Sequence, residues 1–198
     1  MSPSVKPTKL LLLATLLAFG LSACGSSDVP GTLTEDDLPS SVKVDKVTHD
    51  EQSGQVVCPD VNNAEDAHVM TPSDNYAKDR RAAVAYQLGG KGHEYVGSSV
   101  WRLGHPTEAV AEVAAGLDAC VKDQPDVYQR FDVDGYPDAL GYTETGADPP
   151  VFTRRILIPL SDRVVIVSSK RDGDDDFAVR PDDLVKKAVA ASKDAPKP

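Results

Sequence analysis

Basic residues are outnumbered in this sequence of 198 residues, which has 21 Lys and Arg against 31 Asp and Glu. Proteins that bind nucleic acid regardless of its sequence need clustered Lys and Arg to neutralise the phosphates. Adhesion to an anionic bilayer through charge needs a basic patch as well. We therefore expect no nucleic-acid partner and no membrane binding by charge alone, and the excess of carboxylates favours solubility.

Recognisable catalytic and cofactor motifs are missing. The histidines lack the spacing that places two zinc ligands on one helical face; they are His49, His68, His93 and His105. No Gly-x-Ser-x-Gly elbow is present to expose a nucleophilic serine. The glycine-rich stretch 89–92 lacks the Lys-Ser or Lys-Thr pair of a phosphate-binding loop. We expect no catalytic residues, no cofactor and no enzymatic activity.

Long apolar runs are also absent, because the most apolar stretch, Leu10 to Leu21, has about 12 residues where a membrane span needs roughly 20. Lys6 and Lys9 precede this run, and Leu21-Ser-Ala-Cys24-Gly25 follows it. A charged start, an apolar core and small residues are typical of an export signal. We interpret residues 1–23 as a lipoprotein signal peptide and Cys24 as the lipidated residue; the alternative is an ordinary signal peptide in which Cys24 is incidental.

Lipidation of Cys24 predicts a protein tethered to the extracytoplasmic face of the cell membrane. Two or three acyl chains anchor a protein stably, since each buried CH2 group contributes about 0.8 kcal/mol. Without Lys6 and Lys9 of the leader, 19 of the 21 basic residues remain against 31 acidic ones, a net charge of −12. The exported domain is therefore strongly acidic.

Two cysteines remain once Cys24 carries lipid. Cys58 and Cys120 would lie in an oxidising compartment, where paired thiols form disulfides. A bridge across a loop of roughly 60 residues contributes about 4 kcal/mol in the chain-entropy model. The spacing excludes a Cys-x-x-Cys redox motif, and two buried free thiols are the alternative. Cys120 lies beside the apolar face of a predicted helix, so we expect the bridge to pin that helix to the sheet.

The remaining pattern predicts one α+β domain over residues 32–193, after a flexible tether at 24–31 and before a disordered tail at 194–198. Thr34 and Asp37 have the spacing of a helix cap. Predicted strands cover residues 42–47, 82–88, 94–103, 128–133, 139–143, 151–160 and 163–169. Helices are expected from Pro106 and from Pro181, and residues 59–79 as a loop with at most one helical turn. The fold class is a twisted antiparallel sheet with two main helices packed on it.

Several segments resemble the sensor-domain lipoproteins of actinobacteria, which are similar to the extracellular domain of mycobacterial PknH-type serine/threonine kinases. They are Leu33 to Pro39, Val100-Trp-Arg-Leu103, Pro106 to Ala109 and Leu117-Asp-Ala-Cys120. The resemblance implies a domain with a cleft for an unidentified extracellular ligand. Two disulfides are typical of that family, whereas this sequence has cysteines for one.

Aromatic side chains in the predicted strands are candidates for the wall of such a cleft. Tyr86, Tyr95 and Trp101 would offer their ring edges to an apolar or sugar-like ligand, and packing into the core is the alternative.

An acidic run near the end of the chain resembles part of a calcium loop. Asp172, Asp174 and Asp176 match its first three liganding positions and Asp183 its twelfth, but Phe177 occupies the position that needs glycine. We expect a solvated turn here, with calcium as the alternative.

Two functions follow from the sequence. One is a ligand-binding or sensor lipoprotein; the other is a structural or interaction lipoprotein, stabilised by calcium if the acidic run binds it. The partner in either case is an unidentified envelope ligand or protein.

Overall fold

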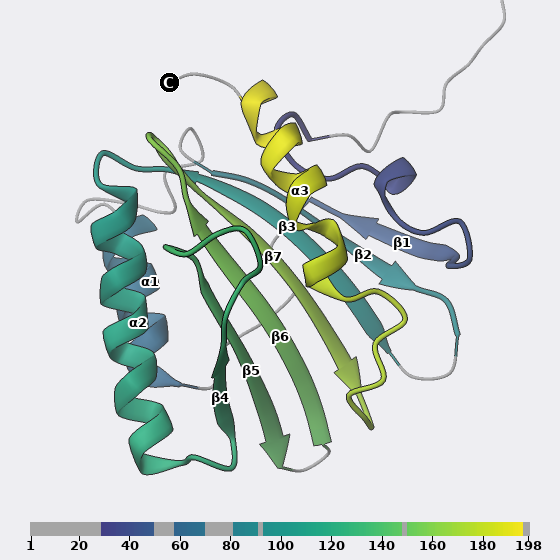
Figure 1. Ribbon diagram of the computed structural model, residues 1–198. Coiled ribbons are helices and arrows are strands. Elements are labelled where there is room, and N and C mark those ends of the chain that lie inside the picture. Colours follow the sequence, from purple (N-terminus) through teal and green to yellow (C-terminus); the bar gives the residue numbers. More distant parts are fainter. Residues whose placement is uncertain (1–28, 50–57, 70–80, 91–92, 148–149, 196–198) are drawn as a thin grey trace, which may run out of the picture.

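The structure is a computed structural model that describes residues 29–49, 58–69, 81–90, 93–147 and 150–195 (Figure 1). The described residues form one antiparallel sheet of seven strands in the order β1-β2-β3-β7-β6-β5-β4. The strands are β1 (Val44–Thr48), β2 (Arg81–Leu88), β3 (Glu94–Arg102), β4 (Tyr128–Phe131), β5 (Leu140–Ala147), β6 (Pro150–Pro159) and β7 (Arg163–Asp172). The helices are α1 (Pro59–Val69), α2 (Pro106–Asp123) and α3 (Pro181–Ala191), with short 3-10 turns η1 (Glu35–Asp37) and η3 (Ser192–Asp194).

The predicted α+β class is confirmed, and β7 is the middle strand of the seven. Its apolar run alternates between two hydrophobic clusters, with Val165 and Val167 in one and Val164 and Ile166 in the other. The first cluster packs under α3 and the second under α2, so the sheet separates two cores (Figure 1). A strand buried on both faces needs this kind of continuous apolar sequence.

Helix α1 corrects the prediction of a loop over residues 59–69, so the described part of the chain has three helices packed on the sheet rather than two main ones. The sequence of α1 has little amphipathic pattern, so its stability comes from tertiary contacts. Pro59 occupies the first helical position, which suits proline. Val61 is fully buried against the cluster that contains Leu117 of α2. The rest of the predicted loop, residues 70–79, lies outside the described residues.

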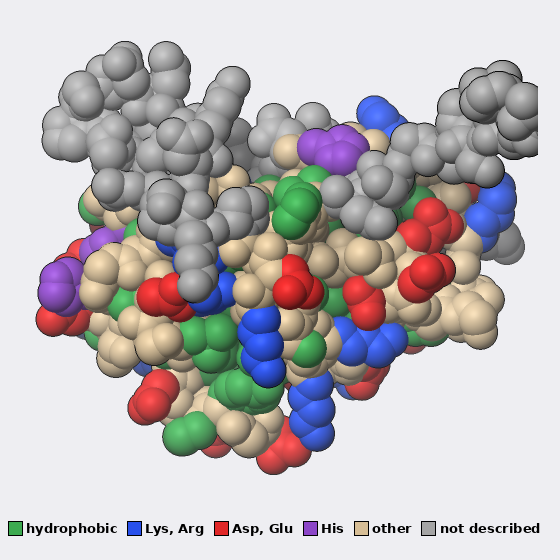
Figure 2. All heavy atoms as spheres, turned by 90° about the horizontal axis from the view of Figure 1, so that it is seen from above, with side chains coloured by type: hydrophobic (Ala, Val, Ile, Leu, Met, Phe, Trp, Pro, Cys, Tyr) green, Lys and Arg blue, Asp and Glu red, His purple; other side chains and the backbone are tan. Residues whose placement is uncertain are grey.

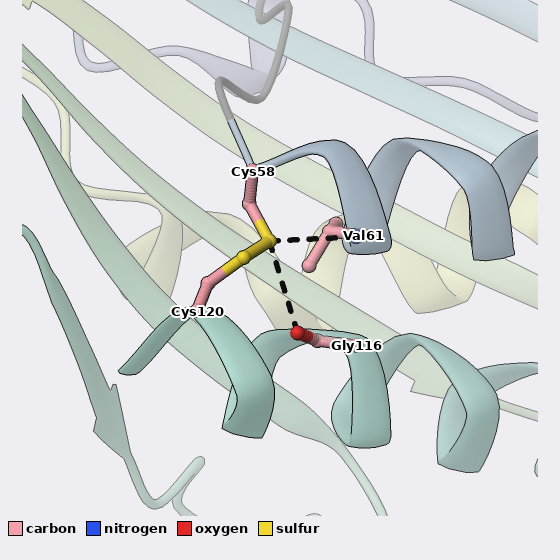
Figure 3. Close-up of a disulfide and its surroundings, with 4 residues drawn as sticks. All are labelled: Cys58, Val61, Gly116 and Cys120. Atoms are coloured by element: carbon pink, nitrogen blue, oxygen red, sulfur yellow. Dashed lines mark hydrogen bonds between the residues drawn. A yellow bond between two sulfur atoms is a disulfide. The ribbon is translucent and has the colours of Figure 1, made fainter. Parts of the chain in front are cut away.

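The predicted disulfide between Cys58 and Cys120 is confirmed, with 6.1 Å between the Cα atoms (Figure 3). It joins the residue before α1 to the last turns of α2. The expectation that it would pin α2 to the sheet was wrong, because Cys58 directly precedes α1 and the bridge therefore joins two helices. The Sγ atom of Cys58 accepts the Val61 N–H at 3.4 Å and so also caps the start of α1.

The two chain ends of the domain pack together. Gly31 has a φ of +91° and lies so close to Ala195 that an added Cβ would be 2.4 Å from the Ala195 Cβ. Ala195 is buried. Gly31, expected in the flexible tether, and Ala195, expected in the disordered tail, are therefore both packed in the domain. The predicted cap at Thr34 is present, with the Thr34 N–H donating to Asp37 at 2.9 Å.

Close contact between α1 and α2 depends on Gly116. A Cβ at this position would lie 2.7 Å from the carbonyl oxygen of Asp60, a backbone atom that cannot rotate away. Gly116 therefore sets the spacing at which the disulfide and the α1 contacts form.

We predict that Gly116→Ala lowers the free energy of unfolding by about 1–3 kcal/mol through overpacking. A loss of stability would be informative, because replacing glycine by alanine within a helix otherwise raises the free energy of unfolding by about 1 kcal/mol. Gly104→Ala, in the bend before α2, is the control for an added Cβ in open space, since nothing lies within 4 Å of a Cβ there. Urea denaturation measures both variants, and a Gly116→Ala protein as stable as wild type would contradict the close approach.

Candidate functional site

The three aromatic candidates do not gather into one site. Tyr86 lies on the α3 face, fully buried, and its hydroxyl donates to the Leu33 carbonyl at 2.8 Å. Trp101 lies on the opposite face in the cluster under α2. Tyr95 shares that face but stands six positions away along β3, about 20 Å at the usual strand rise. Side chains alternate between the two faces of the sheet along the paired strands β2 and β3, so Tyr86 points to the opposite face from Tyr95 and Trp101.

The acidic run forms a turn beyond the end of β7. Asp172 is still part of the strand and pairs with Val151. Asp174 lies 2.8 Å from the Nε of Arg171 and accepts the Asp176 N–H at 3.2 Å. Within the described ranges, no three His, Cys, Asp or Glu side chains are grouped to hold a metal ion.

The histidines stay apart as well. His68 on α1 lies 2.8 Å from Glu112 on α2 and connects these helices. His49, His93 and His105 are exposed on separate loops.

The unusual chemistry of this fold lies in four buried polar side chains between α1 and the sheet, which we call the polar layer. Glu65 comes from α1, Tyr142 and Glu144 from β5, and Arg155 from β6. Their exposed fractions are 9%, 0%, 3% and 1%. The Nη2 atom of Arg155 donates to Oε2 of Glu65 at 3.0 Å, and Tyr142 is the cross-strand partner of Arg155.

The position of Arg155 follows from strand alternation. Its neighbour Arg154 points to the other face, where it donates to both carboxylate oxygens of Asp182 on α3, at 2.6 and 2.7 Å. The Arg154 guanidinium also lies over the ring of Phe131, 3.5 Å from its centroid. Two consecutive arginines of β6 thus contact helices on opposite faces of the sheet.

Burial shapes the electrostatics of the polar layer. Loss of solvent raises the pKa of Glu65, against the attraction of Arg155. Loss of solvent acts to lower the pKa of Arg155, but attraction by Glu65, Tyr142 and Glu144 outweighs it and the pKa is raised. Burial also raises the pKa of Tyr142. The layer therefore favours a charged guanidinium beside a carboxyl that holds its proton more tightly than usual.

Among the described residues, the buried polar-layer atoms with no hydrogen-bond partner include the Oε1 of Glu65 and the hydroxyl of Tyr142. A buried polar group left unsatisfied costs about 1–3 kcal/mol. Such groups are rare in folded proteins, and they are the kind that a ligand can satisfy. The polar layer can therefore accept hydrogen bonds from a polar ligand and donate hydrogen bonds to it.

An apolar hollow lies on the same face of the sheet. Its volume is about 170 Å³, including space open to solvent. It is lined by His68, Trp101, Ala109, Val110, Val113, Leu157 and Val164. Leu157 is two residues from Arg155 on β6, so the hollow adjoins the polar layer along the strand. Typical ligand pockets have volumes of about 300–1,000 Å³, whereas this hollow has no room for even a water molecule, so it is a shallow depression and not a ligand pocket.

Sequence reasoning missed the polar layer. The adjacent arginines within the otherwise apolar β6 were an available signal, because one of them had to face a core. Tyr142 and Glu144 alternate toward the same face of β5, which is a second signal. The sequence offered no such signal for Glu65, since its helix was not predicted.

The described residues define the class of protein as an α+β fold with an open antiparallel sheet, and none of their helices is long and apolar enough to cross a membrane. No protein-family model and no curated protein matches the sequence. Among solved structures, the chain is similar to the extracellular domain of PknH from Mycobacterium tuberculosis. The match has 14% identity and a TM-score of 0.42, and covers 82% of this chain and 91% of that one. A likeness at this level carries no information about ligand or activity.

We predict losses of stability of different size for two substitutions of Glu65 at neutral pH. Glu65→Leu removes the carboxyl that accepts a hydrogen bond from the buried Arg155 and lowers the free energy of unfolding by about 3–5 kcal/mol. Glu65→Gln keeps an acceptor oxygen and costs much less.

The pH dependence has a defined sign. A raised pKa in the folded state means that wild-type stability is full below the unfolded pKa of Glu65 and falls as pH rises through the folded value. The Glu65→Gln variant lacks this pH-dependent loss of stability, so its stability relative to wild type increases as the pH rises from 4.5 upward. Denaturation curves across this pH range measure the difference in the free energy of unfolding. If wild type instead became more stable relative to the variant as the pH rises, the pKa of Glu65 would be lowered in the folded protein.

Proposed function

We propose that the protein is an extracytoplasmic lipoprotein, anchored through Cys24, whose α+β domain binds a ligand without transforming it. The leader supports the anchor, because a short apolar run followed by small residues and cysteine is typical of lipoprotein export. The disulfide between Cys58 and Cys120 supports the compartment, since such bridges persist where thiols are oxidised. The sequence resemblance to actinobacterial sensor lipoproteins agrees with both.

The observation that carries ligand binding is the polar layer with its unsatisfied Glu65 and Tyr142 atoms. Perturbed carboxyl groups and convergent polar atoms are typical of functional sites. Binding is favoured over catalysis because Arg155 engages Glu65 directly. A general base would instead contact a nucleophile. The expected ligand forms hydrogen bonds to the Glu65 carboxyl and the Tyr142 hydroxyl.

The test uses the processed protein purified in detergent. Mass spectrometry should show an acylated Cys24 at the N-terminus; an unmodified terminus at another residue would contradict the anchor. Thermal melting is then measured against a panel of cell-envelope glycans, lipids and peptides. At least one compound class should raise the melting temperature, because a ligand that binds only the folded state stabilises it.

Two matched variants locate the site. Tyr142→Phe removes an unpartnered hydroxyl, so it should melt at or above the wild-type temperature and yet lose most of the ligand-induced shift. Tyr136→Phe, a half-buried tyrosine under the opposite cluster, should keep the shift. A panel that never shifts the melting temperature would favour a structural or interaction role. Equal shifts in both variants would place the ligand elsewhere.

A further inference from the structure

We propose that one defined end of the domain faces the bilayer, at a distance fixed by the short tether. This end, which we call the termini end, is where the first and last described residues meet. It comprises residues 29–32, the end of β3 at 102–104, the β6–β7 turn at 160–163 and the segment 192–195. The inference rests on the proposed anchor at Cys24.

Specific contacts make the termini end a rigid unit. Gly31 packs against Ala195, and Arg102 donates to the Ala195 carbonyl. Arg163 donates to the Ser192 carbonyl. Asp162 in the turn accepts from Arg102 at 3.0 Å, and its backbone carbonyl accepts the Leu103 N–H at 3.2 Å. The start of the domain therefore cannot swing away from the β6–β7 turn.

The tether length sets the distance to the membrane. Cys24 lies five residues before Val29, the first described residue. A fully extended chain spans at most about 3.6 Å per residue, so Val29 is within roughly 18 Å of the lipidated cysteine. Such a tether is shorter than the domain is long. The domain cannot turn over, and its termini end is held at the headgroups.

The opposite end of the sheet then points away from the membrane. Strand β7 runs from Arg163 at the termini end to Asp172, ten residues or about 30 Å of strand. The acidic turn beyond it, residues 173–176, is thus at the far end (Figure 1).

Charge agrees with this orientation. Viewed from above the termini end, cationic and anionic side chains are interspersed among apolar ones (Figure 2). Anionic lipids repel carboxylates, so an exposed cluster of aspartates is best placed away from the surface. The far end is accordingly the one that a soluble partner meets first.

The experiment places a fluorophore at either end of the lipidated protein. Ser161→Cys labels the β6–β7 turn and Asp175→Cys labels the acidic turn; both positions are exposed. Each labelled protein is reconstituted into phosphatidylcholine vesicles whose headgroups carry a nitroxide quencher. We expect roughly twofold or stronger quenching at position 161 than at 175, because about 30 Å of strand separates the two ends.

The outcomes separate the two claims. A protein that does not float with the vesicles contradicts the anchor, and with it the proposed function. A protein that floats but shows equal or reversed quenching overturns the orientation alone. Inserting a flexible Gly-Ser segment of about 20 residues after Ser27 is the matched control, since a tether of that length allows the domain to turn. The quenching difference should then disappear, and its persistence would overturn the argument from tether length.

Discussion

The buried guanidinium of Arg155 imposes the constraint on which the α1 side of the molecule depends. A charge that is 1% exposed must be paired, because removing one partner of a buried ion pair costs several kcal/mol. Its partner Glu65 lies on a helix with little apolar surface of its own. That helix is fixed by the disulfide between Cys58 and Cys120 and by the close approach that Gly116 allows. The covalent bridge thus holds the carboxyl in reach of the guanidinium.

Charged contacts also position a helix on the α3 face of the sheet. Arg154 binds Asp182 at the start of α3, and the hydrogen bond lowers the pKa of that carboxyl. Glu94 of β3 is buried and accepts the N–H groups of Ala178 and Val179 at 3.0 and 3.1 Å, which fixes the approach to α3. Both faces therefore combine an apolar core with a few charged contacts that position helices. On the α1 face, the Oε1 of Glu65 and the hydroxyl of Tyr142 have no hydrogen-bond partner among the described residues, and these two atoms are the reason why the ligand site is proposed there.

Much of the fold was predictable because it rests on local pattern. The apolar run 164–167 predicted the middle strand, and Pro106 and Pro181 predicted the starts of α2 and α3. Helix α1 was not predictable, since contacts with α2 stabilise it and its own periodicity does not. The polar layer depends on that helix and on strand register, so it was missed as well. The aromatic candidates failed for a related reason: Tyr86 and Trp101 lie on the adjacent strands β2 and β3 but face opposite sides of the sheet.

The disulfide positions α1 so that Glu65 can accept the hydrogen bond from Arg155. A double-mutant cycle measures this dependence by combining Glu65→Leu with removal of the bridge through Cys58→Ser and Cys120→Ser. We predict that Glu65→Leu costs less once the bridge is absent, with a coupling free energy of about 1 kcal/mol or more. Additive losses in the free energy of unfolding would show that α1 reaches Arg155 without the bridge, and would contradict the claim.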